Sequence, residues 1–352
     1  MPLSKPQQEI FNRSTRFAAC SAGRRFGKSY LAVWEMARVA RYPDKRVMYV
    51  APSYRQAKSI IFETLKTEML KRRWVKKINE SELTIRLVNN SLITLRSADA
   101  ADSIRGVSCD FAVLDECAFF DRSVWTDVIR PTLSDREGGA LFISTPQGIG
   151  NWFYDLWTDA QHLEDWSAYQ YTTLEGGNVS AAEIQSARRD LSVKTFRQEY
   201  EASFETGGNL LMYSFAAEHN VRPWTGELPP VLHVGLDLNI SKMLATIAVK
   251  TQTGLHIVDE IQLENTNTDE MSQAITQRYP EHKFIVYPDP AGSARKTSAG
   301  GRTDHMILQQ WGLSVKARPR HPAVKDRINT VNRLFQNAAG ERNLFIDPSV
   351  AT

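Results

Sequence analysis

The segment 18–29 constrains the fold more than any other part of this 352-residue chain. It runs from a short apolar stretch through small residues into Gly27-Lys28-Ser29, and a helical pattern follows over 30–40. A loop of this kind between a strand and a helix is typical of phosphate-binding loops, in which backbone N–H groups contact phosphate oxygens. We therefore expect Gly27 and Lys28 to bind nucleotide phosphates and Ser29 to hold Mg²⁺.

A second feature is the apolar run 111–116, which ends in two adjacent acids, Asp115 and Glu116. Charged side chains are rarely buried unpaired, and successive side chains of a strand point to opposite faces. A nucleotide site explains the pair, with Asp115 ordering the Mg²⁺ shell and Glu116 polarising the attacking water. Ala22 stands where the usual loop has glycine, so the loop alone also fits an ordinary helix start.

Composition is that of an ordinary globular protein, with 42% apolar and 24% charged residues, and the length allows two domains. The sequence has no signal-like apolar core at its start and no membrane-length apolar run, so we expect a non-exported protein without a membrane partner. Three cysteines without metal spacing, Cys20, Cys109 and Cys117, favour a reducing compartment. The net charge is +3, but eleven Lys and Arg against four Asp and Glu over 283–342 predict a basic face there.

The hydrophobic pattern from residue 16 to about 145 alternates between strands and helices. Strand-like runs at 16–20, 46–51, 111–115 and 140–144 are separated by helical stretches near 28–40, 53–73 and 122–130, and 83–96 resembles a hairpin. This order predicts an α/β fold, a P-loop NTPase domain with a mainly parallel sheet and helices on both faces. We assign it to 1–205, with a small lid subdomain at about 151–205 that contains one aromatic strand at 166–172.

The glycines and prolines of 206–230 mark that segment as a linker. Three strands joined by short turns are predicted after it, followed by a helix and a fourth strand, at 231–238, 244–250, 254–263, 268–278 and 284–288. This is the order of an RNase H-like α/β fold, which we assign to 231–352. Because the first and fourth strands are neighbours in that fold, Asp237 and Asp289 at their ends are expected to converge.

Two carboxylates that converge from neighbouring strands repel each other unless a cation lies between them. Asp237 interrupts an otherwise apolar strand, and Asp289 follows the fourth strand. The pair therefore predicts a Mg²⁺ or Mn²⁺ site of the kind that hydrolyses phosphodiesters. A turn that Asp289 merely begins is the simpler alternative.

Three further residues flank the nucleotide motifs. Ser144 and Thr145 follow a predicted central strand, where they can sense the γ-phosphate or simply end the strand in a turn. Arg105 lies on a loop before the carboxylate strand. An arginine there can reach the nucleotide of a neighbouring subunit, although Arg105 alone is equally typical of a surface residue.

This set of motifs resembles the large terminase subunit of tailed double-stranded DNA bacteriophages, the ATPase and nuclease that packages viral genomes. Residues 23–29 and 113–116 resemble its two nucleotide motifs, and 49–52 and 144–146 its third landmark pair. The resemblance implies that Arg24 and Arg25 of the loop contact the nucleotide and that Arg105 acts in trans within a ring. It also gives Gln8, in Pro6-Gln7-Gln8, a role in recognising adenine.

In the second half, 234–237 and 287–292 resemble the first two acidic motifs of the family's nuclease domain. No residue matches the family's third catalytic aspartate; the remaining candidates are Asp304, Asp326 and Asp347. We therefore expect an RNase H-like domain that is incomplete at its C-terminus: either the chain is shortened or cleavage is impaired.

The resemblance implies ATP-driven translocation of double-stranded DNA into a procapsid and cutting of concatemeric DNA. The implied cofactors are ATP and Mg²⁺, with Mn²⁺ possible in the nuclease site. The implied partners are double-stranded DNA, the portal protein, the small terminase subunit and further copies of the chain in a ring, in the cytoplasm of an infected bacterium and outside the finished virion. Two alternatives remain: a helicase-like or repair ATPase and nuclease, and a junction-resolving RNase H-like DNA-binding protein with a vestigial phosphate loop.

Overall fold

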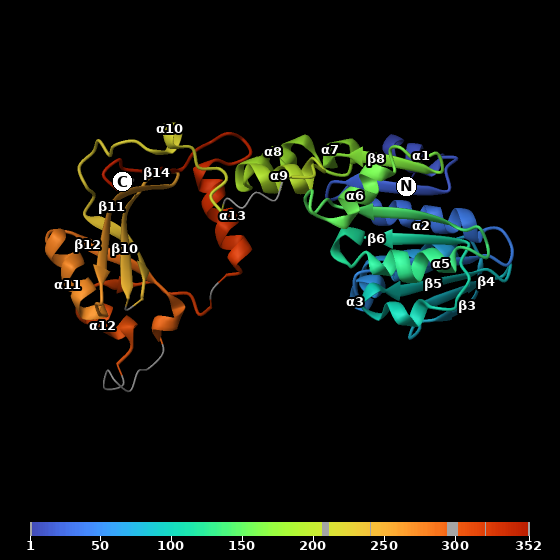
Figure 1. Cartoon of the computed structure of the whole chain (residues 1–352), viewed down its shortest axis with the longest axis horizontal. Helices are drawn as coiled ribbons and strands as arrows, with labels where there is room; N and C mark the ends of the chain where they lie inside the picture. The colour runs from blue at the N-terminus through green and yellow to red at the C-terminus, as the bar shows by residue number, and fades with distance from the viewer. Residues whose placement is uncertain (1, 206–210, 240, 294–301, 321, 351–352) are drawn as a thin grey trace. The chain divides into compact units, whose positions relative to one another are not determined.

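A computed structural model describes residues 2–205, 211–239, 241–293, 302–320 and 322–350. The chain divides into two compact units, one formed by Met1–Ala187 and Lys194–Asn209 and the other by Arg188–Val193 and Leu210–Thr352. Each unit contains its own β-sheet (Figure 1). Of the predicted linker, 206–210 lie outside the described residues, and 211–230 group with the second unit.

The first part of the chain alternates between helices and strands. Up to the fourth strand the elements are α1 (Lys5–Phe11), β1 (Phe17–Ala22), α2 (Lys28–Ala40), β2 (Arg46–Ala51), α3 (Tyr54–Gln56), η1 (Ala57–Phe62), α4 (Glu63–Lys71), β3 (Val75–Asn79) and β4 (Thr84–Leu87). They continue with β5 (Leu92–Ser97), η2 (Ala98–Ile104), β6 (Phe111–Asp115), η3 (Cys117–Phe119), η4 (Val124–Ile129), α5 (Arg130–Thr132) and β7 (Gly139–Ser144). The last are α6 (Trp152–Asp159), β8 (Trp166–Tyr171), α7 (Thr173–Gly176), α8 (Ala181–Asp190) and α9 (Val193–Tyr200).

The sheet of the first unit has the strand order β3-β4-β5-β2-β6-β7-β1-β8. All neighbours from β5 to β8 are parallel, whereas β3, β4 and β5 pair antiparallel. Successive residues of β2 enter two different cores: Tyr49 packs in the cluster that contains Leu31 of α2, and Val50 in the cluster that contains Val128 of η4. The predicted mainly parallel sheet with helices on both faces is confirmed, as is the hairpin.

The burial of β6 explains why a continuous apolar run forms a central strand. All five of its residues are buried, and it pairs in parallel with β2 on one side and β7 on the other. A strand covered on both faces is expected to be apolar at nearly every position. Asp115 ends this strand and is itself only 3% exposed, so its carboxylate lies at the edge of the core.

The aromatic strand expected within the lid belongs to the main sheet instead. β8 pairs in parallel with β1 over its whole length, and the ring of Trp166 stacks on that of Phe17, with centroids 4.9 Å apart. The prediction of a separate lid over all of 151–205 is therefore wrong for β8. Its large aromatic side chains extend the core of the sheet, which stabilises β8 at the sheet edge.

The second unit has a different order of elements. They are α10 (Ala217–Asn220), β9 (Val231–Asp237), β10 (Lys242–Lys250), β11 (Leu255–Glu264), α11 (Thr268–Arg278), β12 (Lys283–Pro288), η5 (Pro290–Ser293), α12 (Asp304–Gln310), β13 (Ser314–Val315), α13 (Val324–Phe335) and β14 (Leu344–Ile346). Across the described ranges, no helix has both the length and the apolar character needed to cross a membrane.

The sheet of the second unit has the strand order β13-β12-β9-β10-β11-β14. β9, β10 and β11 are antiparallel neighbours, and β12 lies parallel to β9 with Pro288 opposite Leu236. The expected adjacency of the first and fourth strands is confirmed. Asp237 and Asp289 therefore follow directly from paired positions at the same edge of this sheet.

Candidate nucleotide-binding site

The first unit contains a cavity of about 1010 Å³ beside the loop that follows β1. Lys28, Ser29, Glu116 and Thr145 line it, and they follow or end three parallel strands of the sheet. In open α/β sheets ligands bind at the carboxyl ends of the strands, where the loops diverge. The motifs that the sequence singled out therefore meet at one place.

The loop 24–27 is held by side chains from distant parts of the first unit. Its carbonyl oxygens accept hydrogen bonds from Thr173, Asn178 and Gln7 at 2.7 to 3.3 Å. Gly27 has φ +97°, a conformation that glycine adopts at little cost. Because these carbonyls are bound elsewhere and the first turn of a helix leaves its N–H groups unpaired, the start of α2 can bind phosphate oxygens.

Ala22 does not weaken the loop. It is the buried last residue of β1, opposite Tyr171 of β8. A Cβ on Gly23 would lie 2.6 Å from Thr173 Oγ1 and 2.7 Å from the carbonyl oxygen of Tyr200. The glycine that close packing requires is thus Gly23, one position after the place where the usual pattern has it.

The cationic side chains of the loop have different surroundings. Lys28 is 7% exposed, and its ammonium donates to the carbonyl oxygens of Ala22 and Gly23 at 3.1 and 3.4 Å. Arg24 is two-thirds exposed and pairs with Glu199 of α9 at 2.5 Å. Arg24 and Arg25 both line the cavity. The nucleotide contact that the resemblance implied for them stays a prediction.

Asp115 lies beside Ser29, as expected for a Mg²⁺ site. The hydroxyl of Ser29 is 3.5 Å from Asp115 Oδ2, and the hydroxyl of Tyr49 donates to the same oxygen at 2.5 Å. Burial raises the pKa of the Asp115 carboxyl, and the charge of Glu116 raises it further. A hydroxyl and a carboxylate are oxygen ligands that suit Mg²⁺, which takes its other ligands from phosphates and water.

Sequence reasoning did not assign Tyr49 a role in the site. Its pKa is raised well above the usual value by burial and by the charge of Asp115, so the phenol stays protonated and acts as a donor. The available signal was a polar-tipped ring in an otherwise apolar strand. Tyr49 lies opposite Val113 of β6, close to the acidic end of that strand.

Glu116 adopts a left-handed conformation, with φ +49° and ψ +42°. Its Oε2 accepts hydrogen bonds from the Thr145 hydroxyl at 3.0 Å, the Thr145 amide at 3.3 Å and the Ser144 hydroxyl at 3.3 Å. Its Oε1 is 3.6 Å from the Lys28 ammonium. Non-glycine residues in this conformation concentrate at functional sites. The structure brings together all four residues, as predicted.

The implied contact of Gln8 with the nucleotide is wrong. The Gln8 amide is exposed and donates to the carbonyl oxygen of Leu3 at 2.7 Å, outside the cavity. Its neighbour Gln7 is buried and lines the cavity, but its amide is occupied: the nitrogen donates to the phosphate loop, and the oxygen accepts from the Ser4 amide at 2.9 Å. Neighbours in a helix point about 100° apart, so only one of two adjacent glutamines can face the loop.

Arg105 follows η2 and is exposed. It is not among the residues that line the nucleotide cavity of its own chain. The action in trans that the resemblance implied for Arg105 stays a prediction.

The second unit places its two predicted acids at neighbouring strand ends. Asp237 is exposed, and Asp289 is half-buried with Oδ1 accepting from the Ala291 amide at 2.7 Å. Asp289 thus begins a turn, which was the simpler alternative for this residue. Within the part of the chain that the structure describes, no group of three or more His, Cys, Asp or Glu side chains is arranged to hold a metal.

The remaining candidate acids have other surroundings. Asp304 is buried and accepts from the Thr268 hydroxyl at 2.9 Å. Asp347 accepts from the Trp224 amide at 2.9 Å, and Asp326 is exposed on α13. Among the described residues, Asp237 and Asp289 therefore remain the two predicted metal ligands, and none of the other three aspartates joins them as a third.

Comparison with known proteins identifies relatives of the chain. A family model described as the terminase large subunit, T4likevirus-type, N-terminal, matches residues 19–214. The large terminase subunit of Escherichia phage T5 is 34% identical over 218 residues, which covers 60% of this chain and 49% of that protein. That of Thermus phage G20c is 30% identical over 243 residues, covering 57% and 49%. The chain spans about half the length of these curated relatives.

Solved structures resemble either the first part of the chain or the whole of it. The ATPase domain of the large terminase of Thermus phage P74-26 matches with a TM-score of 0.52 and 28% identity, over 58% of this chain and 94% of that domain. The large terminase of a thermophilic bacteriophage matches with a TM-score of 0.58 over the whole chain and 89% of that protein. At 15% identity this second likeness shows the fold alone.

Proposed function

The chain belongs to the terminase large subunit family, and from this membership we propose that it is an ATPase that drives double-stranded viral DNA into a procapsid. The observation that carries the proposal is the convergence of Lys28, Glu116 and Thr145 at one cavity, with Asp115 beside the lining residue Ser29. A solved relative, the same large terminase from a thermophilic bacteriophage, has been crystallised with ADP.

ATP is the substrate in this proposal. The N–H groups at the start of α2 and the Lys28 ammonium bind its β- and γ-phosphates. Ser29 and Asp115 would hold a Mg²⁺ ion, which would neutralise part of the phosphate charge. Glu116 orients the water that attacks the γ-phosphorus and accepts its proton as ADP leaves. Arg24 and Arg25 contact the phosphates from the loop, and Arg105 of a neighbouring copy in a ring stabilises the charge that develops during transfer.

Glu116 also connects hydrolysis to movement. Its carboxylate is shared between Lys28 of the phosphate loop and Ser144 and Thr145 at the end of β7. A γ-phosphate that draws Lys28 away changes this balance and shifts the strand end. The proposed result is movement of the helical segments that follow β7 against DNA held through its phosphates.

The second unit is proposed to be an RNase H-like nuclease domain, in which Asp237 and Asp289 hold Mg²⁺ or Mn²⁺ and concatemeric DNA is cut. Its support is the strand order and the position of both acids at one sheet edge. We expect Asp237→Ala to abolish cleavage of supercoiled plasmid. Glu281→Ala, at an exposed acid that precedes β12 at the end opposite Asp289, should preserve it. Equal cleavage by both variants contradicts the assignment.

The proposed partners are double-stranded DNA, the portal protein, the small terminase subunit and further copies of the chain. The proposed location is the cytoplasm of an infected bacterium, with no permanent place in the virion. Co-sedimentation with purified portal rings, in the presence and absence of ATP, tests the portal contact.

The ATPase assignment is tested with Glu116→Gln. This change keeps the size of the side chain but removes the carboxylate, so a fluorescent ATP analogue should bind as before while hydrolysis falls by about 100-fold or more. Glu137→Gln, an exposed acid outside the cavity, is the matched control. Unchanged hydrolysis in Glu116→Gln would contradict the assignment.

A further inference from the structure

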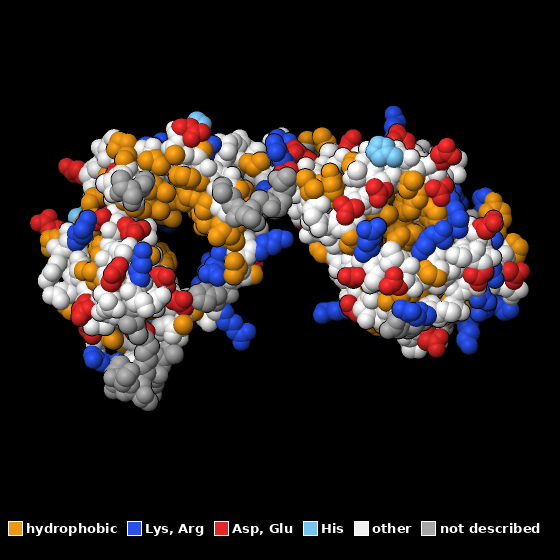
Figure 2. Space-filling view, in the orientation of Figure 1, with side chains coloured by type: hydrophobic (Ala, Val, Ile, Leu, Met, Phe, Trp, Pro, Cys, Tyr) orange, Lys and Arg blue, Asp and Glu red, His pale blue; other side chains and the backbone are white. Residues whose placement is uncertain are grey.

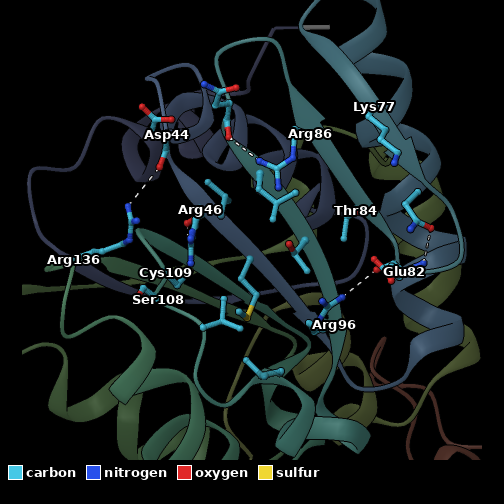
Figure 3. Close-up of a pocket in the computed structure, with 18 residues that line it drawn as sticks. Asp44, Arg46, Lys77, Glu82, Thr84, Arg86, Arg96, Ser108, Cys109 and Arg136 are labelled. Atoms are coloured by element: carbon cyan, nitrogen blue, oxygen red, sulfur yellow. Dashed lines mark hydrogen bonds between the residues drawn. The ribbon is translucent and has the colours of Figure 1, made fainter.

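The first unit has a second cavity, of about 740 Å³, that shares no lining residue with the nucleotide cavity (Figure 3). It lies on the face of the sheet formed by β2, β5, β4 and β3. Thr84 and Thr94 line it, whereas their strand neighbours Ile85 and Ile93 are buried in the core on the opposite face. This end of the sheet therefore has one apolar face and one polar, hollowed face.

Cationic side chains form a row across this face. The strand register places Lys77 beside Arg86, Arg86 beside Leu92, and Leu92 beside Arg46. Neighbouring strands are about 4.8 Å apart, so three steps span about 14 Å. Figure 3 shows Lys77, Arg86, Arg46 and Arg136 in that order across the groove. Lys and Arg side chains are also visible where β3 and β4 reach the surface (Figure 2).

Most of these charges are not neutralised. Among the described residues, the side chains of Arg46, Lys77, Arg86 and Arg96 form no ion pair with a carboxylate, whereas Arg136 pairs with Asp110 at 3.1 Å. Surface cations are commonly balanced by nearby acids. Here the two acids that line the groove, at positions 44 and 82, leave a net positive charge.

Arg96 is the most constrained of these cations. It is partly buried, and its guanidinium donates to the carbonyl oxygens of Glu82 and Leu95, at 3.0 and 3.1 Å. Desolvation lowers its pKa, partly opposed by Glu82. A partly desolvated charge gains from an anionic partner, so an anion in the groove would stabilise this side chain.

The floor between the cations is neutral and polar. Thr84, Thr94 and Asn79 contribute hydroxyl and amide groups, and Met48 and Leu92 contribute apolar surface. Phosphate oxygens and sugars are the parts of a nucleic acid that such groups contact without reading its sequence. The length of the row exceeds that of a single phosphate group.

One wall of the groove is the segment 104–109, from which Ile104, Val107 and Ser108 line the cavity. Arg105 and Gly106 lie between these residues, and Gly106 has φ +80°. Arg105 does not itself line the groove, but it lies on the segment that forms this wall.

We propose that this groove binds the phosphate backbone of DNA without sequence preference and that its occupation restrains the segment that carries Arg105. The inference rests on the proposed function, because it names where the DNA that stimulates hydrolysis is bound. The inference explains why the proposed DNA site and the proposed arginine finger share the segment 104–109. DNA bound in the groove restrains this segment and thereby the position of Arg105.

The test uses the double variant Lys77→Gln/Arg86→Gln of the full chain. Both side chains are exposed, and neither is part of the nucleotide site. The matched control is Arg41→Gln/Lys58→Gln, which removes the same charge from two exposed residues outside both cavities. Binding of a short fluorescent DNA duplex is measured by anisotropy over a range of salt concentrations, beside ATP hydrolysis with and without DNA.

The double variant should bind DNA roughly tenfold more weakly, and its slope of log affinity against log salt should fall by about two, as for two lost phosphate contacts. The control and the hydrolysis without DNA should match the unaltered chain. A variant with unaltered affinity and slope overturns the groove as a DNA site. An unaltered chain that hydrolyses ATP but binds no duplex overturns the inference, while absence of hydrolysis from the unaltered chain contradicts the proposed function itself.

The proposed restraint of the segment that carries Arg105 is tested separately. At saturating DNA the double variant should still show less stimulation of hydrolysis than the control, because a loosely held backbone restrains the wall less. Full stimulation at saturation overturns the link to Arg105. Binding of an acidic peptide that competes with DNA at equal charge concentration would instead assign the groove to a protein partner.

Discussion

Thr145 binds one carboxylate oxygen of Glu116 twice, through its hydroxyl at 3.0 Å and its amide at 3.3 Å. The other carboxylate oxygen of Glu116 faces the Lys28 ammonium at 3.6 Å. The side chain that is proposed to activate water is thus held between a strand end and the phosphate loop. Its orientation depends on both.

Removing the Thr145 hydroxyl with Thr145→Val should therefore slow ATP hydrolysis about tenfold while leaving nucleotide affinity nearly unchanged, since Glu116 loses a positioning hydrogen bond. Steady-state kinetics and binding of a fluorescent nucleotide measure the two effects. Thr126→Val, on the exposed face of η4, serves as the control. A loss of affinity without a loss of turnover would contradict this role.

The position of the essential glycine can be tested directly. Gly23→Ala places a Cβ 2.6 Å from Thr173 Oγ1 and 2.7 Å from a backbone oxygen, so it should distort the loop and weaken nucleotide binding at least tenfold. Ala22→Gly restores the usual pattern but loosens a buried strand residue, at a cost of about 0.5–1 kcal/mol in unfolding free energy. Tighter nucleotide binding by Ala22→Gly would show that the pattern matters more than the packing.

Tyr49→Phe removes a donor from the buried Asp115 carboxyl. We expect the free energy of unfolding at neutral pH to fall by about 1–3 kcal/mol, because a buried acceptor loses its partner. The loss should shrink as pH falls, since burial raises the pKa of Asp115 and a protonated carboxyl depends less on a donor. Urea denaturation measures it, with exposed Tyr42→Phe as control; equal stability of both variants at neutral pH contradicts the account.

His256 should make stability depend on pH. Burial lowers its pKa, and its Nε2 lies 3.0 Å from the carbonyl oxygen of Arg222. The unfolded chain, with a histidine pKa near 6.5, then binds the proton more readily than the folded chain. Stability should be full above about pH 6.5 and fall below it, and His256→Gln should flatten that fall in urea unfolding. Burial also lowers the pKa of His233, so the comparison is between variant and unaltered chain.

The sequence predicted the sheets because their strands carry their own signal. β6 and β7 are continuous apolar runs, and such runs bounded by turns can be assigned without knowing their neighbours. The place of β8 could not be predicted in this way. An aromatic strand in a helical stretch fits either a subdomain or a sheet edge, and only packing against Phe17 decides between them.

Site residues were predicted where chemistry dictates the residue type, as for Lys28 and Asp115. Residues that act through packing were missed. Gln7 rather than Gln8 faces the loop because of the rotation of the helix. Gly23 rather than Ala22 is the tight position because Thr173 and Tyr200 lie against it. Neither choice is visible in residue spacing alone.

The most direct test of the account is ATP hydrolysis by the full chain with and without duplex DNA, comparing Lys28→Ala with Lys71→Ala, an exposed lysine that pairs with Glu68 on α4. The account predicts that DNA stimulates ATP hydrolysis by the unaltered chain. This hydrolysis should be lost in Lys28→Ala and unchanged in Lys71→Ala. Equal DNA-stimulated hydrolysis by the unaltered chain and Lys28→Ala would contradict the claim that this cavity is the site of DNA-stimulated ATP hydrolysis.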